Sequence, residues 1–243
     1  MNVVVHGAAG AMGQVLSSML PSLGHTVIPV ESVTKTTNMI QSIQDVTSCD
    51  VVIDFSHASL LPSVVAFCVT HRIALVVGTT NLSEADQQLL NEAGKQIPLI
   101  ESSNFAYGVA VLRRLVQAAT TYLSEFDIEL TETHHIHKKD SPSGTAKQLL
   151  RDIQQYSTKQ YNVIEGRSST TSAKKEQEIG VHSIRSGANP GEHTIIFSSN
   201  EEQIELTHKA FSRSVFAKGA IQAAAWVVTQ PVGRYRIEEM VTS

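Results

Sequence analysis

Short apolar runs alternate with longer amphipathic stretches over the first hundred residues of the chain. The runs predict strands at residues 3–6, 26–30, 50–55, 73–77 and 97–102, and the stretches between them predict helices at 12–20, 61–71 and 83–95. Pro21 is expected to close the first helix, and Ser83 with Asp86 resembles a capping box at the start of the third. Runs such as DVVIDF and IALVV are typical of parallel strands buried on both faces. The alternation therefore predicts an α/β fold with an N-terminal Rossmann-like, doubly wound parallel sheet.

The hydrophobic pattern changes after a long predicted helix at residues 107–123. Apolar and polar residues then alternate at 126–133, 180–185, 192–197 and 203–207, which is typical of a sheet with one solvated face. The polar stretch 161–176 is predicted as an exposed loop, and an apolar helix is predicted at 214–228. We expect three segments: residues 1–105, a second α+β domain of mostly antiparallel or mixed sheet at 106–215, and a segment 216–243 that returns to the first domain.

Composition excludes several classes of protein. The chain has 243 residues, of which 42% are hydrophobic and 17% charged, so disorder is not its main state. With 19 Lys and Arg against 23 Asp and Glu, the net charge is −4, which offers no general field for nucleic acid. Cys49 and Cys68 form no CxxC motif, and we find neither a signal peptide nor an apolar run of about 18 residues. These features favour a cytoplasmic protein that binds neither nucleic acid nor membrane.

A glycine-rich loop follows the first predicted strand and opens the first predicted helix. Its sequence, GAAGAMG, is a variant of the dinucleotide-binding fingerprint, in which glycine lets the backbone approach a pyrophosphate at the helix N-terminus. Glu31 ends the second strand, where a carboxylate can accept the adenosine ribose hydroxyls and repel a 2′-phosphate. The positive charge of the nearby Lys35 would instead suit a site that tolerates a 2′-phosphate. The predicted cofactor-binding residues of this region are Gly7, Ala8, Ala9, Gly10, Ala11, Met12 and Glu31.

Two further segments lie at the carboxyl ends of predicted strands. The segment GTT at 78–80 follows the fourth strand, and its glycine frees backbone amides to approach a ligand. The alternative is that this segment is a simple turn. The other ends the fifth strand at the expected domain boundary, where an Asn and an aromatic ring could hold a nicotinamide or form a hinge. The predicted cofactor-binding residues here are Gly78, Thr79, Thr80, Ser102, Ser103, Asn104 and Phe105.

Histidine and lysine cluster in the loop after the strand predicted at 126–133. His134, His135 and His137 precede Lys138, and the loop leads into a helix capped by Ser143 or Thr145. Histidine, lysine and a helix N-terminus together suit a small dianionic substrate whose reaction needs a proton. Zinc is the competing ligand, but two adjacent lysines would repel it, so no metal site is predicted. Elsewhere, His193 and His208 are read as structural, and Arg185 and Lys209 either line the substrate cleft or are solvated.

The cluster resembles a known signature. The string ETHHIHKKDSPSGTA at 132–146 is similar to E-x-H-H-x-x-K-x-D-[AS]-P-S-G-T-A of the 4-hydroxy-tetrahydrodipicolinate reductase (dihydrodipicolinate reductase) family. The likeness spans the chain, including GAAGAMG, DFS at 54–56, GTT, SNF at 103–105, GEHT at 191–194, HKA at 208–210 and GRY at 233–235. It implies a dinucleotide-binding domain at 1–105, a substrate-binding and oligomerisation domain at 106–215, and a homotetramer.

The resemblance also implies a reaction and a role for each matched position. The reaction is NAD(P)H-dependent reduction of 4-hydroxy-tetrahydrodipicolinate, a dicarboxylate, with loss of water in lysine and diaminopimelate biosynthesis. His134 matches the proton donor or acceptor and Lys138 the second proton donor. The matched substrate-binding positions are His135, Gly144 and Thr145. Ser32 stands where members that use both cofactors often have Arg, so we expect NADH to be preferred over NADPH.

Two other functions compete with this interpretation. Another two-domain NAD(P) dehydrogenase of the aldehyde type would need a nucleophilic cysteine, but both cysteines lie away from the histidine cluster. A non-catalytic NAD-sensing domain would bind the cofactor but would not need the His, Lys and helix N-terminus together. In the enzyme, the hydride donor and the acid lie on different domains, so domain closure is expected.

Overall fold

The computed structural model describes residues 1–33, 38–168 and 173–242. It divides into two compact units: unit 1 comprises Met1–Tyr107 with Ser214–Ser243, and unit 2 comprises Gly108–Arg213. The chain therefore passes between the units twice, at 107/108 and at 213/214. The helix after the second passage packs on strands of unit 1, as the apolar pattern of residues 214–228 predicted.

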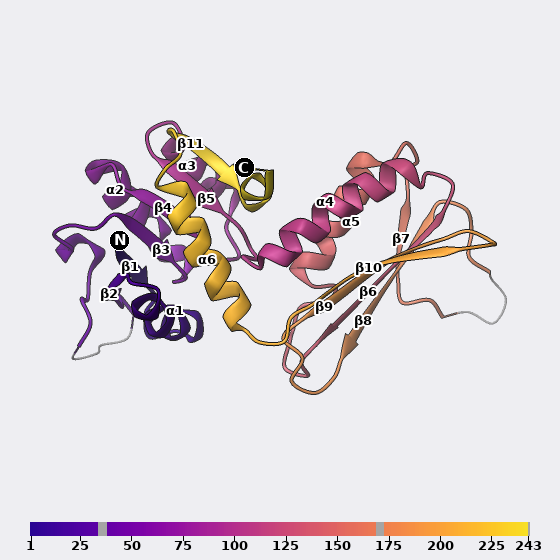
Figure 1. Ribbon diagram of the computed structural model, residues 1–243, viewed down its shortest axis with the longest axis horizontal. Coiled ribbons are helices and arrows are strands. Elements are labelled where there is room, and N and C mark those ends of the chain that lie inside the picture. The colour runs from indigo at the N-terminus through magenta and orange to yellow at the C-terminus, as the bar shows by residue number, and fades with distance from the viewer. Residues whose placement is uncertain (34–37, 169–172, 243) are drawn as a thin grey trace. The chain divides into compact units, whose positions relative to one another are not determined.

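Unit 1 is a parallel sheet with helices on both faces (Figure 1). Its strand order is β11-β5-β4-β3-β1-β2, and every neighbouring pair is parallel. The strands are β1 Asn2–His6, β2 Thr26–Val30, β3 Val51–Asp54, β4 Ala74–Val77, β5 Pro98–Glu101 and β11 Gly233–Arg236. The helices are α1 Ala11–Ser22, α2 Leu61–His71, α3 Glu84–Ala93 and α6 Ser214–Val227, with the short 3-10 helices Ile43–Asp45, Ala58–Leu60 and Ile237–Thr242.

The core of unit 1 explains why β1, β3 and β4 are mostly apolar. Val4, Val52 and Leu75 form one buried cluster with Val64 of α2 and Leu90 of α3. The intervening strand residues are buried as well, because α1 and α6 pack together and α6 contacts β3, β4 and β5. Burial on both faces confirms the predicted doubly wound parallel sheet.

Unit 2 is an α+β body with a mixed sheet of order β10-β9-β6-β8-β7. Strand β6 pairs antiparallel with β9 and parallel with β8, β10 is antiparallel to β9, and β7 is parallel to β8. Residues of α4 and α5, such as Val116 and Leu149, bury one face of the sheet, including Leu130 and Phe197. The bounds are α4 Tyr107–Tyr122, β6 Asp127–His134, α5 Gly144–Tyr156, β7 Asn162–Glu165, β8 Glu178–Arg185, β9 Glu192–Ser198 and β10 Gln203–Lys209.

Two local predictions were wrong, and one strand was not predicted. Helix α1 continues through Pro21, since a proline in the last turn interrupts little of the helix and the N–H groups of Leu23 and Gly24 still close it. The predicted loop 161–176 contains β7, and β11 was not predicted at all. Both strands have four residues, and both are formed by pairing with a neighbour rather than by an apolar pattern. The capping box of Ser83 and Asp86 is confirmed.

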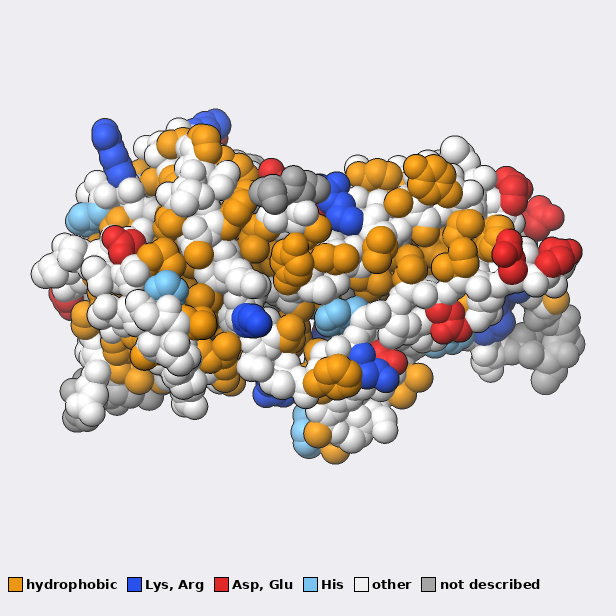
Figure 2. Space-filling view, in the orientation of Figure 1, with side chains coloured by type: hydrophobic (Ala, Val, Ile, Leu, Met, Phe, Trp, Pro, Cys, Tyr) orange, Lys and Arg blue, Asp and Glu red, His pale blue; other side chains and the backbone are white. Residues whose placement is uncertain are grey.

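Apolar side chains also lie on the surface. Figure 2 shows them gathered over α4 of unit 2, where Leu115 and Tyr122 are exposed. Within the described part of the chain, no helix combines the length and hydropathy needed to cross a membrane.

Candidate active site

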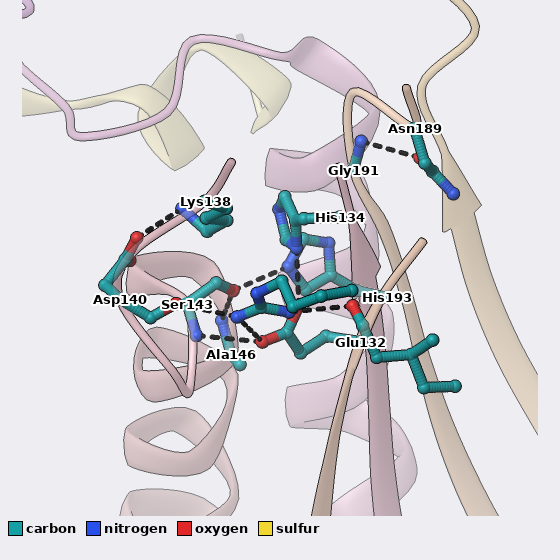
Figure 3. A network of polar contacts seen from close by, with 11 residues as sticks. Glu132, His134, Lys138, Asp140, Ser143, Ala146, Asn189, Gly191 and His193 are labelled. Carbon is teal, nitrogen blue, oxygen red and sulfur yellow. Dashed lines mark hydrogen bonds and ion pairs between the residues drawn. The ribbon is translucent and has the colours of Figure 1, made fainter. Parts of the chain in front are cut away.

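Strand register brings the polar residues of unit 2 together at one end of β6. His134 is the last residue of β6 and pairs with Arg185 on β8, while Glu132 pairs with His193 on β9. Because β6 lies between β8 and β9, residues about fifty positions away in the chain flank the histidine on both sides. Ser143, the N-cap of α5, completes the group. Figure 3 shows Glu132, His134, His193 and Ser143 converging.

Glu132 is the centre of this network. The Nδ1–H of His134 donates to Oε2 at 2.5 Å, and Arg185 donates from Nη1 to Oε2 at 2.9 Å and from Nη2 to Oε1 at 2.8 Å. The backbone N–H of Ser143 donates to Oε1 at 3.2 Å. Burial alone would raise the pKa of Glu132, but the bonds from Arg185 and His134 outweigh it and lower the pKa to about 2. This buried carboxylate is therefore ionised and well satisfied.

These contacts determine which nitrogen of His134 is available for chemistry. Since Nδ1 donates to Glu132, Nε2 is the nitrogen left to exchange a proton. A Cβ built on Gly191, whose φ is +151°, would lie 3.0 Å from that Nε2, so glycine leaves room in front of it. Burial lowers the pKa of His134, and the bond to Glu132 offsets the shift only in part. The geometry is that of a histidine oriented for proton transfer.

His193 stands against His134 as a neutral partner. The two rings meet edge to face with centroids 5.1 Å apart, and His193 Nε2 lies 2.9 Å from Ser143 Oγ. Burial, together with the charge of His134, lowers the pKa of His193 to about 3. The ring is 2% exposed and, being neutral, adds no second positive charge beside His134.

The low pKa of Glu132 makes a prediction about stability and pH. A carboxyl group whose pKa falls from 4.5 to about 2 on folding stabilises the fold above pH 4.5, and this contribution is lost as the pH falls toward 2. We therefore expect the melting temperatures of the wild type and Glu132→Gln to differ most at neutral pH and to converge below about pH 4.5. Glu165→Gln, on the exposed edge strand β7, is the matched control. A gap that stays constant from pH 7 to pH 3 would contradict this assignment.

The loop after β6 supplies charge and a helix N-terminus. The Nζ of Lys138 lies 2.8 Å from Asp140 Oδ1, which lowers the pKa of Asp140 against the effect of burial. Ser143 is the cap, and Thr145 is not, because Ser143 Oγ accepts from the N–H of Ala146. Gly144 is exposed and a Cβ on it would meet nothing within 4 Å, so the first turn of α5 is open to a ligand. His135 is half-buried, and its ring lies 6.3 Å from that of His137.

In unit 1 the glycine loop is folded closely against the sheet. The N–H groups of Gly7 and Ala8 both donate to the carbonyl of Val30, and Gly7 has φ +81°. A Cβ on Gly7 would lie 2.7 Å from the Phe55 carbonyl, and one on Gly13 would lie 2.2 Å from the Gly7 carbonyl. The loop ends at Gly10, the N-cap of α1, whose first turn has no side-chain cap. This strand-to-helix turn, followed by uncapped N–H groups, is the arrangement that receives a pyrophosphate.

The other predicted cofactor residues lie at the same sheet edge. Glu31 accepts from the N–H of Ala9 at 3.1 Å and of Val33 at 3.0 Å, so it is joined to the glycine loop. Lys35 lies outside the described residues. Gly78 gives room to the ring of Phe55, which meets Phe105 edge to face with centroids 5.9 Å apart. The remaining predicted residues, Thr79, Thr80, Ser102, Ser103 and Asn104, follow β4 and β5.

Two residues of the site, Glu132 and Arg185, were not predicted as site residues from the sequence. Glu132 was named only as the first residue of the signature. Arg185 was expected either to line the substrate cleft or to lie on a solvated surface. A signal for Glu132 existed, because a glutamate two residues before a histidine on a strand points to the same face. The partner from β8 had no such local signal. Lys209 on the edge strand β10 is paired with Glu192 on the neighbouring strand β9 at 3.0 Å. Among the described residues, no group of three His, Cys, Asp or Glu is arranged to hold a metal ion.

Comparison with known proteins places both units in one family. Residues 1–105 match the family described as "Dihydrodipicolinate reductase, N-terminus", and residues 108–241 match "Dihydrodipicolinate reductase, C-terminus". The 4-hydroxy-tetrahydrodipicolinate reductase of Exiguobacterium sibiricum is 39% identical, over 100% of this chain and 97% of its own. That of Caldanaerobacter subterraneus subsp. tengcongensis is 37% identical, over 98% and 97%.

Solved structures show the same fold. A dipicolinate-bound dihydrodipicolinate reductase from Paenisporosarcina sp. TG-14 superimposes with a TM-score of 0.77 at 19% identity, covering 99% of each chain. A diaminopimelate dehydrogenase of C. glutamicum, solved with its ligand, has a TM-score of 0.59 at 12% identity, covering 98% of this chain and 93% of its own.

Proposed function

The chain belongs to the dihydrodipicolinate reductase family, and we propose that His134 and Lys138 of unit 2 carry out the family's reaction with a dinucleotide held by unit 1. The reaction is the NAD(P)H-dependent reduction of 4-hydroxy-tetrahydrodipicolinate to tetrahydrodipicolinate with loss of water, in lysine biosynthesis. The match over both units leaves no support for a sensing domain or for an aldehyde-type dehydrogenase.

The observation that supports the proposal is the hydrogen bond between His134 Nδ1 and Glu132 Oε2. Hydride addition leaves an electron-rich ring that must take up a proton, and an oriented histidine with a free Nε2 can supply it. His134 is that acid, and Glu132 holds its ring and stabilises the positive charge that it carries before transfer. Lys138 binds a ring carboxylate and gives a proton to the departing 4-hydroxyl group, which leaves as water while the neighbouring ring carbon loses a proton. His135 and the N–H groups of Gly144 and Thr145 bind the other carboxylate at the start of α5.

The residues of unit 1 fit a dinucleotide, which supplies the hydride when bound. Any side chain at Gly7 or Gly13 would collide with backbone, whereas Gly10 meets only the Gly7 carbonyl, at 3.2 Å. Residues 7–12 hold the pyrophosphate, Glu31 the adenosine ribose, and residues 78–80 and 102–105 the central and nicotinamide portions. The homotetramer and the cytoplasmic location stay predictions.

The test of the function is oxidation of NADH followed at 340 nm. The substrate is made in the cuvette from pyruvate and aspartate semialdehyde by the synthase that precedes the reductase. We expect turnover that needs both the synthase and its substrates. Binding of the dinucleotide with no turnover under these conditions would contradict the proposal.

We further propose that NADH is preferred over NADPH. The carboxylate of Glu31 repels a 2′-phosphate, and Ser32 offers no charge to attract one. Ser32→Arg is expected to raise kcat/KM for NADPH by about tenfold to a hundredfold, because a hydrogen bond to a charged group contributes roughly 1.5–3 kcal/mol. The measurement compares kcat/KM for both dinucleotides in the wild type and the variant. A wild type with higher kcat/KM for NADPH would overturn the preference.

A further inference from the structure

A buried histidine and aspartate lie side by side beneath the glycine loop of unit 1. His6 ends β1 and Asp54 ends β3, the two residues are register partners, and both are 0% exposed. The Nδ1 of His6 lies 2.8 Å from Asp54 Oδ1. Two ionisable groups in an apolar sheet are costly unless each is hydrogen-bonded, so their partners indicate what the pair does.

Asp54 collects hydrogen bonds from two segments besides His6. Ser56 donates to Oδ1 from its hydroxyl at 2.6 Å and from its backbone N–H at 3.3 Å. The hydroxyl of Thr79 donates to Oδ2 at 2.7 Å. Thr79 is buried, whereas the next residue, Thr80, is exposed. The aspartate thus joins the ends of β3 and β4.

His6 extends the network to the end of β2. Its Nε2 lies 3.2 Å from the hydroxyl of Ser32, an exposed residue that follows Glu31 directly. One pair of side chains therefore connects the ends of four adjacent strands, β1 to β4, at the carboxyl edge of the sheet. Three of these ends lead into the glycine loop, Glu31 and residues 78–80, to which we have assigned the dinucleotide.

The direction of each hydrogen bond follows from the donors and acceptors available. Both oxygens of Asp54 accept from Ser56 or Thr79, so the Nδ1–H of His6 is the donor in the bond to Oδ1. In the ring tautomer that this bond selects, Nε2 is an acceptor. The hydroxyl of Ser32 has a single proton, which it donates to Nε2. Ser32 Oγ then has only lone pairs to offer to a ligand. A ribose hydroxyl can donate to such an oxygen, whereas an ionised 2′-phosphate cannot.

We propose that His6 and Asp54 are positioning residues for cofactor selection, which make the Ser32 hydroxyl an acceptor that favours the ribose of NADH over the 2′-phosphate of NADPH. The inference rests on the dinucleotide site proposed above and deepens it, because it assigns part of the selectivity to an uncharged hydroxyl. Glu31 repels the phosphate by charge, and Ser32 discriminates by hydrogen-bond polarity.

The test is dinucleotide binding to the full chain, measured by the fluorescence of NADH and of NADPH without substrate. Ser32→Ala removes the hydroxyl, and His6→Asn keeps a donor toward Asp54 but has no ring nitrogen to reach Ser32. Each variant is expected to lower the ratio of NADPH to NADH dissociation constants by about threefold to tenfold, the effect of one hydrogen bond. The double variant should match the single ones, since both remove the same interaction.

Controls separate selectivity from stability and from the cofactor assignment itself. Ser18→Ala on α1 removes a hydroxyl that bonds only to its own helix at Val15, and it should leave the ratio unchanged. A melting curve for each variant checks folding, and loss of folding would weaken binding of both dinucleotides without changing their ratio. Unchanged ratios in Ser32→Ala, or effects that add in the double variant, would overturn the inference. A wild type that binds neither dinucleotide would overturn the cofactor site first.

Discussion

Replacing His134 with alanine is expected to lower kcat by about 10²- to 10⁴-fold, the usual contribution of a general acid. The variant loses the ring whose Nδ1 is bound by Glu132 and whose Nε2 faces the space left by Gly191. The effect should appear in kcat rather than in KM for the dinucleotide, because the glycine loop of unit 1 is untouched. The measurement is the coupled assay at 340 nm at saturating NADH and substrate.

A matched histidine controls for the substitution itself. His71 ends α2 in unit 1, where its Nδ1 bonds to the carbonyl of Phe67, and His71→Ala should keep kcat within about twofold of the wild type. Lys138→Ala should raise KM for the substrate and lower kcat/KM. If His134→Ala kept most of its kcat, and Lys138→Ala kept its kcat/KM, the proposed assignment of both residues would be wrong.

The largest effect on stability is expected from the buried ion pair between α4 and α5. Arg113 donates from Nε to Asp152 Oδ2 at 2.6 Å and from Nη2 to Oδ1 at 2.9 Å, and the two residues are 8% and 3% exposed. Arg113→Ala leaves the carboxylate of Asp152 buried, and within the described residues Gln117 is the side chain that still donates to it. Removing one partner of such a pair typically lowers the free energy of unfolding by about 3–5 kcal/mol. Urea denaturation followed by circular dichroism measures the change.

A second substitution tests whether the unpaired charge is the cause. The double variant Arg113→Met with Asp152→Leu replaces the pair with apolar side chains, and it should recover most of the lost stability. Lys95→Ala breaks the exposed pair with Glu92 and should change the unfolding midpoint little. A double variant as unstable as Arg113→Ala would show that the arginine stabilises unit 2 by packing rather than by charge.

Much of the fold follows from local patterns. The strands β1, β3 and β4 of unit 1 are apolar because they are buried on both faces, and β6 alternates because one face of its sheet packs on α4 and α5. The short strands β7 and β11 were not predicted because their residues do not form an apolar pattern. In β11, the four residues GRYR have no apolar period, and only the backbone of β5 makes them a strand.

The candidate site also contains residues that could be predicted from the sequence and residues that could not. His134, Lys138, the glycine loop and the start of α5 could be found because each lies in one short segment whose residue types suit its chemistry. The hydrogen-bonded partners could not be found in this way, since Arg185 lies 53 positions from Glu132 and Asp54 lies 48 from His6.

The sequence by itself determined the types of the longer elements, the parallel and mixed sheets and the segments that carry the chemistry, because periodicity, turns and caps act over a few neighbouring residues. Only the tertiary structure decided which charges meet. Strand order and register place Glu132 between His134 and Arg185, and His6 between Asp54 and Ser32. A shift of one residue in the pairing of a strand would turn its side chains to the other face, so these contacts depend on the whole sheet rather than on any one segment.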